Sequence, residues 1–188
     1  MGAALLRSAV ATLIGGRPKD VRIDRRCDRC GRPHGRPRAP GTGLFLSVSH
    51  SRDRIAVAVT TVADVGVDVE WVDRRWPLLA DLSEFGGLIL AADEFVHNPA
   101  EFFTYWTRKE AAVKATGDGM QVPLSEVLVT RPNEPPALRS YLDRPGLQMQ
   151  LMDLVAVRDY AAAVAILTDV MPEVRQRSAA ELDTPGLR

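Results

Sequence analysis

Residues 65–70 have the sequence Val-Gly-Val-Asp-Val-Glu, in which valine alternates with glycine or an acid. A β-strand places side chains two positions apart on the same face, so this stretch predicts a strand with a buried valine face. Asp68 and Glu70 then share the opposite face. A lone pair of acids on a strand is most simply a solvent-exposed edge, and the neighbouring sequence decides whether this pair does more.

A second stretch predicts a helix that supplies a third acid. Residues 106–114 have the sequence Trp-Thr-Arg-Lys-Glu-Ala-Ala-Val-Lys. Glu110 and Lys114 lie one turn apart on one face of such a helix, together with Trp106. Glu110 and the two strand acids, if brought together, would form an oxygen-rich site for a hard cation such as Mg²⁺. Lys114 would suit a phosphate held by that cation.

The two stretches together resemble the signature of the 4′-phosphopantetheinyl transferases. That signature is Gly-[Ile/Val]-Asp-x-Glu, followed further along the chain by [Phe/Trp]-[Ser/Cys/Thr]-x-Lys-Glu-[Ala/Ser]-x-x-Lys. The chain matches every specified position: Gly66, Val67, Asp68, Glu70, Trp106, Thr107, Lys109, Glu110, Ala111 and Lys114. Two upstream stretches, Gly35-Arg36-Pro37 and Ser47-Val48-Ser49-His50-Ser51, resemble further landmarks of the family.

The resemblance implies an α+β fold with two similar α/β halves packed about a pseudo-twofold axis and an active cleft between them. We expect residues 1–72 to form the N-terminal half, residues 73–170 the C-terminal half with the signature helix, and residues 171–188 a polar tail. This is the pseudodimeric, surfactin-synthetase-activating type, which implies a monomer. Fewer residues precede Gly35 than such members usually carry, so we expect a first half shortened at its N-terminus and weak, salt-sensitive binding of coenzyme A.

Apolar spacing and turn residues predict the individual elements. The expected helices are residues 3–14, 77–91 and 98–117. The expected strands are residues 21–23, 44–48, 55–60, 65–71, 127–130, 148–155 and 160–167. Asn98-Pro99-Ala100-Glu101 is typical of a helix start, and Gly117 of a helix end. The Pro-rich stretch at residues 131–145 predicts a loop.

The family resemblance also implies a reaction and its ligands. The enzyme would transfer the 4′-phosphopantetheine arm of coenzyme A to a serine of an apo acyl- or peptidyl-carrier protein and release adenosine 3′,5′-bisphosphate. The residues expected to hold Mg²⁺ are Asp68, Glu70 and Glu110. The residues expected to contact coenzyme A are Arg36, Ser49, His50 and Lys114. The residues expected to take part in catalysis are Glu110, as base directly or through a water, Lys114 and Glu94.

Two charged residues leave alternatives open. Glu94 corresponds to a family acid that helps to deprotonate the carrier serine, but residues 89–90 are Ile-Leu where the family has Phe-Phe. Asp93 is therefore an alternative. Lys109 is rotated from Glu110 by about 100° around the helix axis. It is either a contact to the carrier protein, a structural contact or a solvated charge.

A loop rich in arginine contains Cys27 and Cys30, with His34 close by. A structural zinc site takes four ligands, and the sequence has no second cysteine pair, so His50 or His97 would have to complete it. We therefore favour two reduced thiols over zinc. The arginines of this loop suit the 3′-phosphate of coenzyme A or an acidic carrier surface. They are Arg25, Arg26, Arg29, Arg32, Arg36 and Arg38.

The composition excludes several classes of protein. The chain has 188 residues, 46% of them hydrophobic, which is enough to bury one good core or two small ones. Its 24 basic and 24 acidic residues give a net charge of zero, so no overall field favours nucleic acid. No apolar run is long enough to span a membrane, and the N-terminus lacks the basic region of a signal peptide. A cytoplasmic enzyme without nucleic-acid or membrane partners is expected.

Three rival functions remain to be compared. A metal-dependent nuclease of the Asp…Glu-x-Lys type needs a lysine two positions after its glutamate, whereas Trp71-Val72 follow Glu70. A zinc-stabilised binding module would leave the carboxylates unexplained. A catalytically weakened family member that binds coenzyme A or a carrier protein is the main alternative. The intact metal ligands argue against it, and the short N-terminus argues for it.

Overall fold

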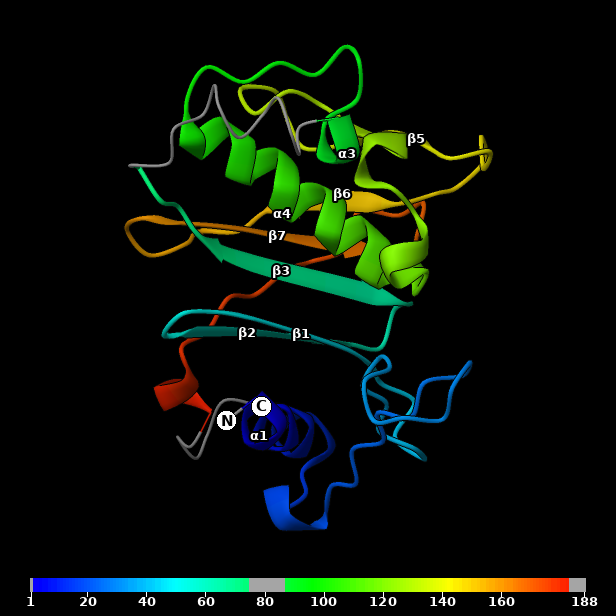
Figure 1. Cartoon of the computed structure of the whole chain (residues 1–188). Coiled ribbons are helices and arrows are strands. Elements are labelled where there is room, and N and C mark those ends of the chain that lie inside the picture. The colour runs from blue at the N-terminus through cyan, green and yellow to red at the C-terminus, as the bar shows by residue number, and fades with distance from the viewer. Residues whose placement is uncertain (1, 75–86, 183–188) are drawn as a thin grey trace.

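The computed structural model describes residues 2–74 and 87–182, which form two helix-covered layers of strands (Figure 1). The helices are α1 (Gly2–Ile14), α3 (Gly87–Ile89) and α4 (Pro99–Thr116), with short 3₁₀ turns at Pro18–Asp20, Gly119–Gln121, Leu124–Glu126 and Ala179–Glu181. The strands are β1 (Phe45–Ser51), β2 (Arg54–Thr60), β3 (Val65–Trp71), β4 (Val127–Val129), β5 (Leu138–Tyr141), β6 (Gln150–Asp153) and β7 (Tyr160–Ile166). None of the described helices is long and apolar enough to cross a membrane.

Most of the predicted elements are confirmed. The helices expected at residues 3–14 and 98–117 and all but one of the expected strands are present with small shifts at their ends. The strand expected at residues 21–23 is wrong, because the chain there makes only an isolated bridge between Asp24 and Arg38. β5 lies inside the stretch that we expected to be a loop. The helix predicted at residues 77–91 falls mostly outside the described residues, and its described end contains α3.

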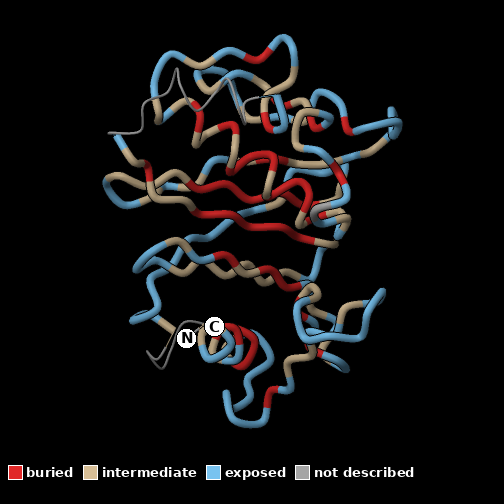
Figure 2. Tube along the Cα trace, in the orientation of Figure 1, coloured by how far each residue is buried: buried red, intermediate tan, exposed pale blue. Residues whose placement is uncertain are grey.

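α1 covers the hairpin of β1 and β2 on one side of the molecule, while α4 covers the sheet β3-β7-β6 on the other (Figure 1). The buried residues follow these two helix faces and the strands beneath them (Figure 2). Between α1 and the hairpin they form one apolar cluster, which includes Leu6, Val10 and Leu46. Between α4 and its sheet they form a second cluster, which includes Tyr105 and Ala165. A third, smaller cluster of Val65, Val164 and Ile166 has Ala58 of β2 packed against it. The described residues therefore form two helix-covered cores and this smaller cluster, in line with the α+β class; the pseudo-twofold axis and the boundary at residue 72 stay predictions.

The ends of α4 are fixed by the residues that the sequence indicates. The Asn98 side chain accepts a hydrogen bond of 3.0 Å from the backbone N–H of Glu101, and the Glu101 carboxylate accepts one of 2.7 Å from the backbone N–H of His97. Pro99 occupies the first turn, where no backbone N–H is needed. Gly117 ends the helix in the left-handed conformation at φ 79°. These local signals set the position of the signature helix.

β3 joins the two cores. Along one edge it pairs antiparallel with β7, with Asp68 opposite Ala163. Along its other edge the serines of β1 replace the usual backbone pairing. Ser47 Oγ accepts a hydrogen bond of 3.0 Å from the Val67 N–H, and Ser51 Oγ accepts one of 3.1 Å from the Trp71 N–H. The strand that carries two of the acids is thus held from both sides.

Gly66 lets β3 approach α4 closely. A Cβ at this position would lie 1.9 Å from the carbonyl oxygen of Ala111 and 2.4 Å from the backbone nitrogen of Ala115. We expect Gly66→Ala to lower the free energy of unfolding by about 1–3 kcal/mol or more, because the helix has to move away from the strand. Urea unfolding measures this change. Gly146→Ala is the control, since a Cβ there meets nothing within 4 Å; equal losses in the two variants would contradict the close-packing explanation.

Candidate active site

One pocket brings the signature strand, the signature helix and the end of β1 together. The residues that line it are Arg25, Val48, Ser49, His50, Asp68, Glu70, Trp106, Glu110 and Lys114. Six of these were expected to be ligands or catalytic residues from the sequence, and they come from three elements separated along the chain. The pocket is therefore the candidate active site.

Asp68 lies at the buried end of this pocket. Its Oδ1 accepts hydrogen bonds of 2.5 Å from Lys114 Nζ and 2.7 Å from Ser49 Oγ. Its Oδ2 is buried and has no hydrogen-bond partner. Burial raises the pKa of Asp68 above its ordinary value, while the Lys114 ammonium opposes that rise. A buried carboxylate oxygen without a partner is costly and fits the approach of a cation.

Glu70 and Glu110 add two further carboxylates to the same pocket. Glu70 accepts a hydrogen bond of 2.7 Å from Ser51 Oγ. Burial raises the pKa of both glutamates, and the neighbouring Asp68 charge raises each further. Three carboxylates that line one pocket form a donor set that suits a hard divalent cation.

The three carboxylates do not form a closed cage. In the described part of the chain, the group whose ligand atoms all lie within 4.8 Å of one another is Cys27, Cys30 and His34, and the acids do not meet that limit. Like charges keep carboxylates apart. The acids therefore fit a cation by their chemistry and by the free oxygen of Asp68, with further ligands left to substrate and water.

Arg36 lies in the scaffold and not in the pocket where we expected it. Its guanidinium donates a hydrogen bond of 2.7 Å to the Lys114 carbonyl, a second to the Ala115 carbonyl, and pairs with Asp64. Carbonyls at the end of a helix have no partner within the helix, and a cation there is favourable. Among the described residues, Arg25 is the arginine that lines the pocket.

Arg36→Met should therefore weaken the fold. We expect the free energy of unfolding to fall by about 1–2 kcal/mol, because the helix-end carbonyls lose charged donors, although the unpartnered Arg36 Nε reduces the loss. Arg158→Met is the matched control, since that side chain is almost fully exposed. Chemical denaturation measures both. Unchanged stability together with weaker binding of coenzyme A would contradict the scaffold role.

Glu94 and Lys109 form a buried ion pair away from the pocket. Glu94 also accepts hydrogen bonds of 2.9 Å from the Ala91 N–H and 3.3 Å from the Val129 N–H. The structure thus uses the Glu94 carboxylate to hold the backbone, which corrects the expectation that it faces the carrier serine. Asp93, the alternative, is exposed and pairs with Arg139. Neither acid is among the described residues that line the pocket.

Lys109 is a structural contact, which was one of the three alternatives. Its side chain is fully buried, and Nζ donates hydrogen bonds of 2.8 Å to the Ile89 carbonyl and 3.0 Å to the Leu124 carbonyl. The alternative of a solvated charge on the helix surface is wrong. Burial lowers the pKa of Lys109, and the Glu94 carboxylate opposes that change.

Sequence reasoning missed two contributors to this site. Ser51 orients Glu70, and its place in the alternating Ser47-x-Ser49-x-Ser51 pattern was a usable signal, because alternate residues of a strand share a face. Arg25 lines the pocket from the loop before β1. No local pattern distinguishes it from the other arginines of that loop.

Comparisons with known proteins agree with the geometry. A family model described as the 4′-phosphopantetheinyl transferase superfamily matches residues 64–165. The 4′-phosphopantetheinyl transferase HetI of Nostoc sp. is 32% identical over 171 residues, which cover 88% of this chain and 68% of that protein. The 4′-phosphopantetheinyl transferase AcpT of Salmonella typhi is 37% identical over 83 residues, 41% of this chain and 42% of that protein. AcpT of Escherichia coli O157:H7 is 38% identical over 84 residues, 42% of this chain and 43% of that protein.

Proposed function

This chain belongs to the 4′-phosphopantetheinyl transferase superfamily, and on that premise we propose a reaction for it. It transfers the 4′-phosphopantetheine arm of coenzyme A to a serine hydroxyl of an apo acyl- or peptidyl-carrier protein and releases adenosine 3′,5′-bisphosphate. The observation that carries the proposal is the pocket in which Asp68, Glu70, Glu110 and Lys114 meet. We also propose that the protein acts as a monomer.

The three acids are the proposed holders of a magnesium ion. Asp68 offers a buried oxygen that has no other partner, and Glu70 is oriented by Ser51. Glu110 lines the same pocket from α4. When bound there, Mg²⁺ would neutralise the negative charge of the coenzyme A diphosphate. The remaining ligands would be waters and substrate oxygens, which is the usual state of this ion in proteins.

The basic side chains of the pocket bind and orient the diphosphate. Lys114 Nζ already lies at the pocket wall, bound to Asp68 and 3.3 Å from the Val67 carbonyl. His50 and Ser49 line the pocket from the end of β1; the His50 imidazole can donate to an anion, whereas the Ser49 hydroxyl must first give up its hydrogen bond to Asp68 Oδ1. Arg25 adds a guanidinium from the loop, a group that pairs well with phosphate. Together they place the phosphorus next to pantetheine within reach of the attacking hydroxyl.

Glu110 is the proposed base. The serine oxygen of the carrier forms a bond to the phosphorus next to pantetheine, and the serine proton passes to the Glu110 carboxylate directly or through a water. The bond from that phosphorus to the bridging oxygen breaks, and adenosine 3′,5′-bisphosphate leaves with the electron pair. Burial raises the pKa of Glu110 in the metal-free protein, and a bound cation would lower it again, so the base role rests on the position of Glu110 in the pocket.

Mass spectrometry of apo-carrier proteins tests the proposal. A panel of acyl- and peptidyl-carriers is incubated with the protein, coenzyme A and Mg²⁺, and at least one should gain the mass of one phosphopantetheine group. Omission of Mg²⁺ with a chelator present should abolish the gain. If no carrier gains mass while calorimetry shows binding of coenzyme A, the alternative of a weakened, binding-only family member is favoured instead.

A further inference from the structure

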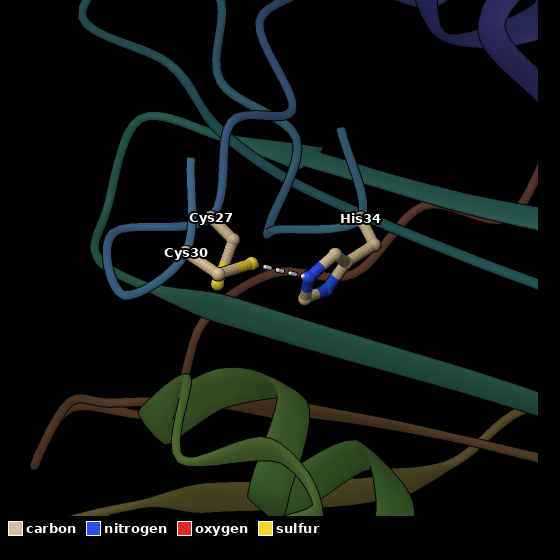
Figure 3. Close-up of side chains that lie close together, drawn as sticks. All are labelled: Cys27, Cys30 and His34. Atoms are coloured by element: carbon tan, nitrogen blue, oxygen red, sulfur yellow. Dashed lines mark hydrogen bonds between the residues drawn. The ribbon is translucent and has the colours of Figure 1, made fainter. Parts of the chain in front are cut away.

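The loop that the Asp24–Arg38 bridge closes contains three side chains of types that can bind a metal, and the proposed transfer reaction does not use them. Cys27, Cys30 and His34 lie close together and face a common point (Figure 3). Cys30 Sγ is 2.9 Å from His34 Nε2. One ligand atom from each of the three residues lies within 4.8 Å of the others. The sequence raised a zinc site here, but we favoured two reduced thiols because there is no second cysteine pair; the convergence of the three side chains is what the structure adds.

The backbone of the loop makes a tight turn that begins at Cys27. The Gly31 N–H donates a hydrogen bond of 2.9 Å to the Cys27 carbonyl, and Gly31 takes the left-handed conformation at φ 70° that this tight turn requires. The Cys27 N–H donates a hydrogen bond of 2.8 Å to the Arg32 carbonyl, which ties the turn to the segment that leads to His34. The turn therefore presents both thiols toward one point.

The base of the loop is closed in a way that keeps His34 in place. Gly35 N–H donates a hydrogen bond of 2.7 Å to the Arg25 carbonyl, and His34 N–H donates one of 2.9 Å to the Arg32 carbonyl. A Cβ at Gly35 would lie 2.6 Å from the Arg26 carbonyl oxygen, so the two sides of the loop touch at this residue. This close backbone packing therefore holds the His34 imidazole near the two thiols.

We propose that Cys27, Cys30 and His34 form a zinc site. Two thiolates and an imidazole are ligands that Zn²⁺ favours, whereas magnesium prefers oxygen. On binding, both thiols release their protons to solvent, and the two thiolates balance the charge of the ion. The described residues add no fourth thiolate, imidazole or carboxylate to the group, and Cys30 and His34 are exposed. A water therefore takes the fourth position.

The site would clamp a loop that reaches the candidate active site at one end and the end of α4 at the other. Arg25 before Cys27 lines the pocket, and Arg36 after His34 holds the end of α4. A bound ion would fix the chain between these two arginines without touching the carboxylates. The zinc site is thus separate from the proposed magnesium site in both ligands and place.

Metal analysis and cobalt substitution test this proposal. The protein purified under reducing conditions should contain about one zinc per chain, since the site has a single set of ligands. After the zinc is removed, Co²⁺ should produce thiolate-to-cobalt charge-transfer absorption and the intense visible bands of tetrahedral cobalt. Cys27→Ser and His34→Asn should each weaken metal binding by more than the roughly 10–100-fold that loss of an outer partner costs. His97→Asn, at an exposed histidine outside the group, is the matched control.

Circular dichroism confirms that each variant is folded before its metal content is compared. A protein without zinc, with no charge-transfer absorption and with two titratable thiols, would overturn the proposal. So would a Cys27–Cys30 disulfide in the purified protein, or a parental cobalt spectrum in His34→Asn. These readouts need no carrier protein and no transfer assay. Their failure is therefore distinct from a failure of the proposed transferase function.

Discussion

Asp68→Asn, Glu70→Gln and Glu110→Gln should each nearly abolish transfer of phosphopantetheine to an apo-carrier protein. For Glu110 the expected loss in turnover is roughly 10²–10⁴-fold, the usual contribution of a general base. For Asp68 and Glu70 the loss should be greatest at limiting Mg²⁺, because each variant removes charge from a ligand. Initial rates measured over a range of Mg²⁺ concentrations separate the two effects. A weakened metal site recovers part of its rate at high Mg²⁺, and a missing base does not.

The same three variants should remain folded. Burial raises the pKa of all three acids, and the neighbouring Asp68 charge raises the pKa of Glu70 and Glu110 further, so the charged forms are already disfavoured in the metal-free protein. Melting temperatures in the presence of a chelator should therefore be equal to or higher than that of the parent for Glu70→Gln and Glu110→Gln. Glu126→Gln is the matched control, since that exposed glutamate lies outside the pocket. Near-parental turnover of all three variants at limiting Mg²⁺ would show that the metal assignment is wrong.

The sequence predicted the features that depend on local chemistry. The cap at Asn98 and the end at Gly117 set the position of α4, and the alternation of residues 65–70 set the face of β3. Once the helix position and the strand face are assigned correctly, the three acids and Lys114 are expected to face the same pocket. The resemblance to a family then supplied the pairing of two stretches that are distant along the chain, which no local pattern contains.

The features that escaped prediction depend on which surfaces meet. The helix phase shows that Lys109 and Glu110 face different directions, but it cannot show that the 3₁₀ turn at Leu124–Glu126 covers the Lys109 side. Arg36 was expected at coenzyme A because Gly35-Arg36-Pro37 resembles a landmark of the family. Its actual partners are backbone carbonyls far along the chain, and backbone groups carry no residue-specific signal. β5 was missed because prolines on both sides of it predict a loop.

Lys109→Met is expected to lower the free energy of unfolding by about 3–5 kcal/mol, although the lysine belongs to the family signature. Methionine fills much of the same volume, so the loss comes from charge and not from a cavity. The variant leaves the buried Glu94 carboxylate without its counterion and leaves the carbonyls of Ile89 and Leu124 without a donor. Lys19→Met, at an exposed lysine, is the matched control and should change stability little. Urea unfolding gives both values.

Two comparisons distinguish this structural role from a catalytic one. Adding Glu94→Gln to Lys109→Met removes the stranded charge and should recover part of the lost stability, because removing both partners of a buried pair costs less than removing one. Lys114→Met should behave in the opposite way. Its Nζ lies at the pocket and its side chain is partly exposed, so turnover or the Michaelis constant for coenzyme A should change while stability changes less. If Lys109→Met is as stable as the parent but inactive, Lys109 acts on the substrate. The buried ion pair with Glu94 would then not be the reason for a lysine at this position.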